Sequence, residues 1–247
     1  DGFVFWTKNL APLEEALREV RARGFPFTVQ YTVNGYPREL ERAVTDWRRA
    51  AGHMHWLAAE FGARVPVWRY DTVVFTELTP AAWHAENFGR ISGALRGATD
   101  EVVISFAQIY RKTRRNLELA ARAQGFAWRD PAWEEKRALL GELSAIARAN
   151  GQRATVCAQP EAEGEAARCI DAARLADVAG APVRARTKGN RPGCECAESR
   201  DIGGYETCPD GCVYWYGVEA AGRARGRGRA HDPEAEMLGE GREISAG

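Results

Sequence analysis

The sequence has no net charge, little lysine and no long apolar run. Its 34 Lys and Arg residues balance its 34 Asp and Glu residues, so no overall field attracts nucleic acid or an anionic membrane at pH 7. Only four of the basic residues are Lys, a bias that a GC-rich genome explains without arginine chemistry. No apolar segment approaches the roughly 18 residues of a membrane span, and no basic leader with an apolar core is present. We therefore expect a cytoplasmic protein with no membrane partner, and we do not expect nucleic acid binding.

Several common catalytic motifs are also absent. The chain has no G-x-x-x-x-G-K-[ST] phosphate loop, no G-x-G-x-x-G fingerprint and no G-x-S-x-G elbow, which argues against nucleotide hydrolysis and serine chemistry. The histidines of the first half of the chain also give no indication of a metal or catalytic site. His53 and His55 are two apart in a predicted helix and point to different faces, so we do not expect a shared metal site there. His84 is expected at the surface, with no role.

The length and composition suit one well-buried domain, since the 247 residues are 45% apolar. The chain opens at Asp1 and enters the apolar stretch FVFWTK almost at once, so we expect that upstream sequence is missing. We predict a (β/α) domain over 1–180, a Cys-rich segment over 181–218 and a disordered tail over 219–247. The alternating arginines of this tail are expected to be solvated, and they are Arg223, Arg225, Arg227 and Arg229.

Short runs rich in Val, Ile and aromatic residues recur along the first part of the chain. They lack clean alternation, which is typical of strands covered on both faces. The predicted strands are Phe3–Thr7, Phe27–Val33, Val65–Tyr70, Val102–Phe106 and Arg153–Ala158. The helices predicted between them are Leu13–Arg23, Glu39–Phe61, Pro80–Leu95, Lys112–Ala123 and Trp133–Asn150. This alternation indicates an α/β fold with a parallel sheet, either a (β/α) barrel or an open doubly wound sheet.

Polar residues gather where the predicted strands end, which is where both architectures bind ligands. They are Lys8, Asn9, Gln30, Thr32, Arg69, Asp71, Ser105, Gln108 and Cys157. Among these, the candidate catalytic residues are Lys8, Arg69, Asp71 and Cys157. The candidate cofactor-binding residues are Gln30, Arg69 and Asp71.

Each of these candidates also has a purely structural interpretation. Arg69 and Asp71 project in the same direction from the end of a strand, so they can bind a carboxylate or a ribose, or pair with each other inside the domain. Lys8 can contact an anionic ligand or lie along the rim with its ammonium group in water. Cys157 and Cys169 can act as thiol hydrogen donors or as small buried hydrophobic residues.

Four of the six cysteines fall in a segment rich in Gly and Pro, and they are Cys194, Cys196, Cys208 and Cys212. The spacing C-x-C followed by C-x3-C is a metal-site pattern, because loops let thiolates converge. A pair of disulfides is the alternative, which a cytosolic compartment disfavours. Thiolates select zinc or iron–sulfur clusters, and spacing does not fully decide between them. The four cysteines are therefore the predicted metal ligands, of a [4Fe–4S] cluster or of zinc.

The sequence CPDGCVYW favours the cluster. C-x3-C-x2-C is the spacing with which radical-SAM enzymes hold three corners of a [4Fe–4S] cluster, whose open iron binds S-adenosylmethionine. Here Trp215 stands at the third position, and an indole is not a metal ligand because its ring nitrogen has no free lone pair. If Cys194 or Cys196 takes the vacant corner, the open iron is retained. If both do, the cluster is closed, and if neither does, the site is inactive.

At these residues the sequence resembles a known family, domain of unknown function 1848, a prokaryotic radical-SAM-like group. The resemblance covers nearly everything from Gly2 to Gly217. It rests on FVFWTKN at Phe3–Asn9, FTVQYTVNGYP at Phe27–Pro37, WRYD at Trp68–Asp71, ISFAQIYRKTRRN at Ile104–Asn116, CID at Cys169–Asp171 and CECAESRDIGGYETCPDGCVYWYG at Cys194–Gly217.

The resemblance implies a barrel related to that of radical-SAM enzymes, with its cluster motif near the C-terminal end and with no established substrate. This sequence departs from the family pattern twice. The family begins with a further strand and an SRRTD-like turn, which are absent here, so a TIM-like barrel without its first unit is expected. The family also has Cys where Trp215 stands.

We therefore predict a radical-SAM-like iron–sulfur protein that uses S-adenosylmethionine on an unknown small molecule, with ferredoxin or flavodoxin as electron donor. The alternative is a non-catalytic barrel protein in which zinc or a closed iron–sulfur cluster ties the Cys-rich segment to the rest of the chain. A third possibility is a degraded gene product that aggregates because a missing strand exposes two sheet edges. The sequence leaves open whether the chain is an enzyme.

Overall fold

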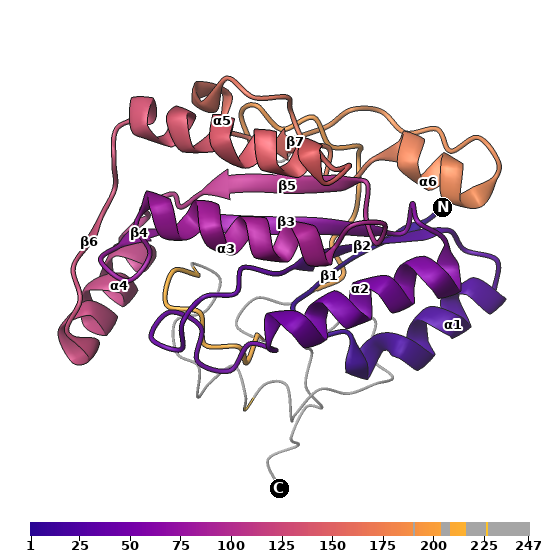
Figure 1. Cartoon of the computed structure of the whole chain (residues 1–247). Coiled ribbons are helices and arrows are strands. Elements are labelled where there is room, and N and C mark those ends of the chain that lie inside the picture. Colours follow the sequence, from indigo (N-terminus) through magenta and orange to yellow (C-terminus); the bar gives the residue numbers. More distant parts are fainter. Residues whose placement is uncertain (190, 204–207, 216–225, 227–247) are drawn as a thin grey trace, which may run out of the picture. The chain divides into compact units, whose positions relative to one another are not determined.

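A computed structural model describes residues 1–189, 191–203, 208–215 and 226 of the chain (Figure 1). The chain divides into two compact units. The first comprises 1–35, 45–107 and 129–199, and the second comprises 36–44, 108–128 and 200–247. The predicted tail over 219–247 lies outside the described residues, apart from Gly226.

The first unit is built on a parallel sheet. Its strands are β1 (Phe3–Thr7), β2 (Phe27–Thr32), β3 (Pro66–Val73), β5 (Glu101–Phe106) and β7 (Arg153–Val156). They lie in the order β1-β2-β3-β5-β7, so each strand pairs with the sheet strand that precedes it in the chain. Because all pairs are parallel, the carboxyl ends of the five strands share one edge of the sheet.

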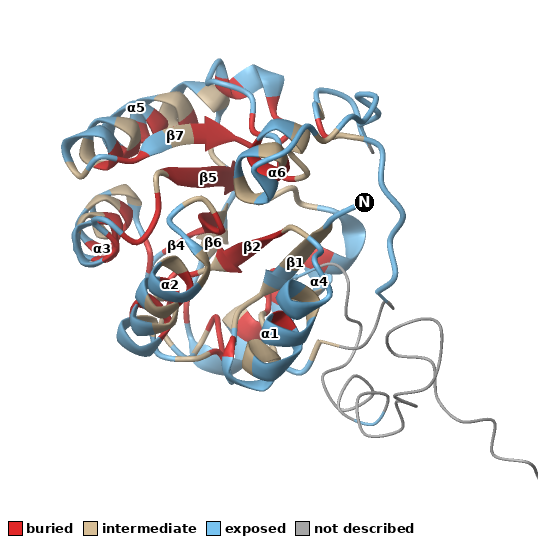
Figure 2. Ribbon diagram, turned by 90° about the vertical axis from the view of Figure 1, so that its right-hand side faces the viewer, coloured by how far each residue is buried: buried red, intermediate tan, exposed pale blue. Residues whose placement is uncertain are grey.

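Helices connect these strands. In the first unit they are α1 (Glu14–Ala22), α2 (Trp47–Phe61), α3 (Ala81–Ala94), α5 (Trp133–Ala149) and α6 (Ala172–Ala179), and the second unit contains α4 (Arg111–Gln124). Short 3-10 turns cover Ala11–Leu13 and Pro160–Ala162, and β4 (Phe75–Thr76) pairs with β6 (Trp128–Arg129). Figure 2 shows α1, α2, α3 and α5 along one side of the sheet. Among the described residues, no helix combines the length and the apolar character that a membrane crossing requires.

The two faces of the sheet differ in chemistry because side chains alternate along each strand. Tyr31, Trp68, Tyr70 and Ile104 belong to the main apolar core, which also contains the inner residues of α2, α3 and α5. The positions between them carry polar groups, and they include Thr28, Gln30, Arg69, Asp71, Ser105 and Thr155. A polar face of this kind needs hydrogen-bonding partners once water is removed from it.

The chain that follows β7 supplies the cover for this polar face. Cys157, Cys169 and Cys196 pack against Val67 and Val103, the apolar residues of the same face. Backbone hydrogen bonds hold the cover together, as between Ala197 N and Ile170 O (2.9 Å). The cysteine-rich segment of the first unit is therefore part of the fold rather than an appendage.

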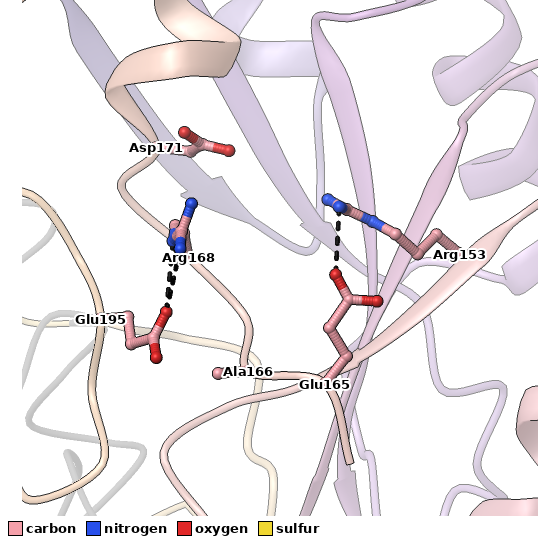
Figure 3. A pocket seen from close by; sticks show the side chains of 6 residues that line it. All are labelled: Arg153, Glu165, Ala166, Arg168, Asp171 and Glu195. Atoms are coloured by element: carbon pink, nitrogen blue, oxygen red, sulfur yellow. Dashed lines mark hydrogen bonds and ion pairs between the residues drawn. The ribbon is translucent and has the colours of Figure 1, made fainter.

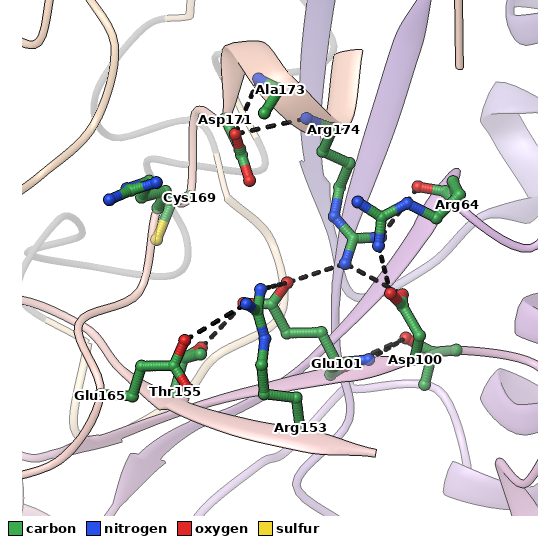
Figure 4. Close-up of polar contacts among 12 residues, drawn as sticks. Arg64, Asp100, Glu101, Arg153, Thr155, Glu165, Cys169, Asp171, Ala173 and Arg174 are labelled. Carbon is green, nitrogen blue, oxygen red and sulfur yellow. Dashed lines mark hydrogen bonds and ion pairs between the residues drawn. The ribbon is translucent and has the colours of Figure 1, made fainter. Parts of the chain in front are cut away.

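A second buried polar cluster fixes α6 at the amino ends of the strands (Figure 4). Arg174 of α6 is 2% exposed and donates through Nη2 to Glu101 Oε2 (2.8 Å) and through Nη1 to Arg64 O (3.0 Å). Glu101 also accepts hydrogen bonds from Thr155 Oγ1 (2.9 Å) and Arg153 Nη2 (3.2 Å). Arg174 Nη2 also lies 2.9 Å from Asp100 Oδ1, so two carboxylates and a carbonyl hold the buried guanidinium, as in a structural ion-pair cluster.

The predicted strands agree with the structure, and most predicted helices agree within two residues at each end. The exception is α2, which begins at Trp47 and not at Glu39. Asp46 is its N-cap, because its side chain accepts a hydrogen bond from Arg48 N (2.9 Å). The residues before Asp46 instead form a loop that belongs largely to the second unit.

The α/β class is confirmed, but the predicted TIM-like barrel is not. Within the described residues the parallel sheet has five strands and does not close, so β1 and β7 are its edges. Closing a parallel barrel of this kind takes about eight strands. The strand order also never reverses, so the sheet lacks the switch point of a doubly wound fold.

Candidate functional site

Arg69 is the centre of a polar site at the carboxyl ends of the strands. Its side chain is 6% exposed and leaves β3 on the polar face of the sheet. Its Nε donates to Asp71 Oδ2 (3.0 Å), and its Nη1 donates to Gln30 Oε1 (3.2 Å) and to Cys169 Sγ (2.8 Å). Burial lowers the pKa of Arg69, but the electrostatic interactions with Cys169 and Asp71 raise it more, so the pKa lies well above its ordinary value. The guanidinium is a permanent cation in this site.

Asp71 is the solvent-facing partner of this pair, since its side chain is 27% exposed. Burial raises the pKa of the Asp71 carboxyl, but the charge of Arg69 and a hydrogen bond from Ser105 Oγ lower it more, and the nearby Lys8 ammonium adds to this. The net pKa lies below the ordinary value, so Asp71 is ionised at neutral pH. Gln30 completes the site and donates through Nε2 to Cys169 O (3.0 Å).

A buried network behind the sheet holds the backbone of Asp71 in place. Asn34 donates through Nδ2 to Asp71 O (3.1 Å) and accepts from Asp71 N at Oδ1 (3.0 Å). Asn87 Nδ2 donates to Asn34 O (2.7 Å) and to Tyr70 Oη (3.2 Å), and Tyr70 Oη lies 2.8 Å from His84 Nδ1. This chain of amides and rings connects α3 to the carboxyl end of β3.

His84 was expected at the surface, and that prediction is wrong, because the residue is fully buried in this network. Its Nε2 lies 3.0 Å from Val74 O, and since a carbonyl only accepts, Nε2 carries the proton and Nδ1 accepts from Tyr70. Burial lowers the pKa of His84 to about 4, so the ring is neutral at physiological pH. The residue is structural and supports the site from behind.

A row of thiols borders Arg69. Cys157 Sγ and Cys169 Sγ are 3.6 Å apart, and Ile170 N donates to Cys196 Sγ (3.4 Å). The hydrogen bond that Cys157 gives to Cys169, together with burial, raises the pKa of Cys157. The hydrogen bond from Cys157 lowers the pKa of Cys169, but a bond to Cys196 and burial raise it more. The bond received from Cys169 lowers the pKa of Cys196, so negative charge in this row is favoured at Cys196.

The second unit holds the other two predicted ligands. Cys208 and Cys212 are partly exposed, and Cys208 Sγ lies 3.5 Å from Asp210 Oδ2. Cys212 forms an antiparallel bridge with Glu41, and burial, followed by the charges of Cys212 and Glu41, raises the pKa of Tyr214 well above its ordinary value. These contacts fix the segment over 208–215 to the segment over 36–44 within that unit.

The comparison with protein families decides the affiliation of the chain. The family model described as Domain of unknown function (DUF1848) matches residues 1–217. The chain belongs to this family. No curated protein and no solved structure matches the DUF1848 chain. The comparisons therefore support membership of this family and nothing more specific. The activity of the protein has to be argued from the site.

The structure brings together most of the residues that the sequence nominated. Lys8, Gln30, Arg69 and Asp71 meet at one edge of the sheet of the DUF1848 chain, and Cys157 lies beside them through Cys169. Of the predicted metal ligands, Cys194 and Cys196 belong to the first unit, whereas Cys208 and Cys212 belong to the second.

Two members of the site were not singled out from the sequence as partners of Arg69. Cys169 was one of two possible thiol donors, but its contact with Arg69 spans 100 residues of chain and has no local signal. Asn34 comes two residues after the end of β2, and Asp71 lies near the end of β3. Its position after a strand was the signal that could have found it.

The six cysteines are the candidate donors for a metal site. Thiols are the donors that iron–sulfur clusters and zinc prefer, and none of the six cysteines, all within the described residues, is part of a disulfide. In the part of the chain that the structure describes, however, no three His, Cys, Asp or Glu side chains are placed to hold a metal ion. The donor chemistry fits a cluster, and the assembled metal site stays a prediction.

A surface pocket lies over the segments that carry Cys169 and Cys196 (Figure 3). It is lined by Arg153, Glu165, Ala166, Arg168, Asp171 and Glu195. Its charges pair with each other, as between Arg153 Nη1 and Glu165 Oε1 (3.2 Å) and between Arg168 Nη2 and Glu195 Oε2 (3.1 Å). A pocket whose ions are already paired has little to offer a charged ligand, so the edge around Arg69 is the better candidate site.

Proposed function

We propose that this DUF1848 chain is a radical-SAM-like iron–sulfur protein that acts on a small polar molecule bound beside Arg69. The observation that carries the proposal is the combination at one sheet edge of a buried cation, a partly exposed carboxylate and thiols. At the amino ends of the strands the Arg174 and Glu101 side chains are 2% and 6% exposed, whereas Asp71 is 27% exposed. Perturbed groups at the carboxyl ends of parallel strands are characteristic of functional sites.

The residues of the site suit a ligand with both polar and anionic character. Lys8 and Arg69 supply positive charge, and the exposed part of Asp71 can accept hydrogen bonds from hydroxyl or amino groups. Arg69 is locked by Gln30, Asp71 and Cys169, so its charge is fixed in position before a ligand arrives. We infer that Asp71 contacts the ligand and that Gln30 orients Arg69.

Cys194, Cys196, Cys208 and Cys212 would hold the cluster. Bound there, a [4Fe–4S] cluster supplies a low-potential electron for the cleavage of S-adenosylmethionine. Cys208 and Cys212 are suited to this task because both are partly exposed. Trp215 is 39% exposed at the position where the motif would have its third thiolate, so Cys194 or Cys196 has to complete the ligand set. A partly open barrel related to that of radical-SAM enzymes is part of the same proposal.

A second candidate is a structural metal site without catalysis. It is favoured by the way the segment over 208–215 is fixed in the second unit, where Val213 N donates to Leu40 O (3.0 Å) and Ala43 N donates to Asp210 O (3.0 Å). A metal at Cys208 and Cys212 would then stabilise this loop pair, as zinc does in small domains.

Anaerobic purification of the full chain, followed by iron, sulfide and zinc analysis, separates these candidates. We expect about four irons and four sulfides per chain, with an absorption shoulder near 400 nm. Zinc without sulfide would reject the iron–sulfur proposal and support the structural metal site. With S-adenosylmethionine and dithionite, the reduced protein is expected to form 5′-deoxyadenosine. A cluster that yields none would restrict the function to electron transfer or structure.

Matched variants test the ligand assignment. Cys208→Ser and Cys212→Ser should each lower the iron content, whereas Cys157→Ser, which replaces a thiol outside the motif, should leave it unchanged. Trp215→Cys should raise the yield of 5′-deoxyadenosine if the missing thiolate limits the reaction. Equal iron content in the Cys208 and Cys157 variants would contradict the assignment.

A further inference from the structure

The thiols of Cys157 and Cys169 form a close pair that the proposed cluster does not use. Their sulfur atoms are 3.6 Å apart, at the carboxyl end of β7 and in the segment that covers the sheet. Backbone hydrogen bonds fix both sides of the pair, since Cys157 N donates to Ile104 O (3.0 Å) and Ala167 N donates to Val156 O (2.8 Å). A disulfide needs its two sulfurs about 2 Å apart, so side-chain rotation and a small shift would join them.

Positive groups flank both sulfurs. Arg69 Nη1 donates to Cys169 Sγ (2.8 Å), and Arg191 Nη2 donates to Cys157 Sγ (3.3 Å). Guanidinium donors next to sulfur favour the negative charge that develops on a thiol as it attacks or leaves. The pair thus packs against apolar side chains on one side and accepts hydrogen bonds from two guanidinium groups on the other.

We propose that Cys157 and Cys169 form a reversible disulfide when the protein meets a hydroperoxide. One thiol sulfur attacks a peroxide oxygen, so that an S–O bond forms, the O–O bond breaks, and the leaving oxygen takes up the thiol proton as water. The second sulfur then attacks the sulfenic sulfur; an S–S bond forms, the S–O bond breaks, and a second water leaves with the second proton. Two thiols and hydrogen peroxide give one disulfide and two waters, and the sulfurs lose the two electrons that the peroxide gains.

The disulfide would act on the candidate site through Arg69. In the reduced protein Cys169 Sγ accepts one of the hydrogen bonds that hold the guanidinium. A disulfide sulfur is a weaker acceptor than a thiol sulfur, so oxidation loosens Arg69 from the cover while Asp71 and Gln30 still hold it. Oxidation of the pair thereby changes the hydrogen bonding of Arg69 at the ligand site.

Peptide mapping tests the pair directly, because trypsin separates the cysteines. Cleavage after Arg153, Arg168 and Arg174 places Cys157 in the peptide 154–168 and Cys169 in 169–174, while Cys194 and Cys196 fall together in 189–200. The full chain is treated with hydrogen peroxide, alkylated and digested without reductant. We expect the peptides 154–168 and 169–174 to be joined, and dithiothreitol to separate them.

Controls make the outcome decisive. Cys157→Ala and Cys169→Ala should each abolish the linked peptides, and circular dichroism checks that both variants fold. A linkage of 169–174 to 189–200 in place of 154–168 would overturn the proposal, as would irreversible oxidation of Cys157 and Cys169 without any linkage. Iron content is measured on the same samples, so a failed cluster proposal and a failed disulfide proposal are told apart.

Discussion

The amino ends and the carboxyl ends of the parallel strands each carry a buried arginine paired with a carboxylate. The two pairs differ in the residues that surround them. At the amino ends of the strands Arg174 and Glu101 are 2% and 6% exposed, and their other partners are Arg64, Asp100, Arg153 and Thr155. At the carboxyl edge Arg69 is 6% exposed, whereas Asp71 is 27% exposed and the neighbours include thiols. Chemistry of the same kind therefore stabilises the fold at the amino ends of the strands, and we propose that it binds a ligand at the carboxyl ends.

The largest expected effect is at the amino edge. Arg174→Met would leave Glu101 buried beside a single exposed arginine, and breaking a buried pair in this way costs about 3–5 kcal/mol. Denaturant unfolding of the two proteins measures the loss. Because this pair lies at the opposite ends of the strands from the candidate site, the iron content and the product yield of the folded variant should stay unchanged. A loss below 1 kcal/mol would show that the amino edge is not structural.

Acid should weaken the support behind the carboxyl edge. The pKa of His84 is about 4 in the folded protein and 6.5 in the unfolded chain, so below pH 6.5 only the unfolded chain takes up the proton. The stabilisation from a neutral His84 is complete above pH 6.5 and falls by about 2 kcal/mol by pH 5. Below pH 4 the total loss reaches about 3 kcal/mol.

The measurement is denaturant unfolding between pH 7 and pH 5. His84→Gln should show a smaller decrease in stability over this range than the original protein. His55→Gln, which replaces an exposed imidazole, is the control and should keep the original decrease. If the His84 variant and the control have the same pH dependence, the neutral ring does not support the site.

Asp71→Asn should separate function from stability. The amide can keep hydrogen bonds to Arg69 and Ser105 but loses the charge, so we expect a loss of roughly 1–3 kcal/mol, smaller than that of Arg174→Met. Formation of 5′-deoxyadenosine in the presence of the natural ligand, or turnover of that ligand, should be abolished. A variant as active as the original protein would place Asp71 with the structural pairs.

The smallest effect is expected at an exposed pair. Arg168 and Glu195 have side chains 57% and 48% exposed, and such surface pairs contribute about 0–1 kcal/mol. Arg168→Gln should therefore shift the unfolding midpoint barely, and added salt should remove even that shift. A larger loss would mean that this pair helps to hold the cover on the sheet.

Sequence reasoning went furthest where the signal is local. Runs such as Val102–Phe106 predict strands by composition, and the spacing of Arg69 and Asp71 places both side chains on one face. Parallel strands then bring their carboxyl ends to one edge, which is why Lys8 and Gln30 meet this pair. These steps need no knowledge of distant contacts.

The rest depended on contacts between distant residues. The thiol of Cys169 reaches Arg69, and Arg174 reaches Glu101, across long stretches of chain with no periodic pattern to announce them. His84 has an ordinary helical position, and only the packing of Tyr70 and Val74 around it explains its burial. Whether strands close into a barrel depends on their number and stagger, which short runs of sequence do not encode.

The strand order allows the sheet to form in the same order as the chain is synthesised. Each strand of this sheet pairs with the sheet strand that precedes it in the chain. The sheet can therefore assemble from β1 onwards, in the order of synthesis. The cover that carries Cys169 and Cys196 emerges only after β7. Until then the polar face around Arg69 lacks the segment that covers it in the folded chain, and water can reach it.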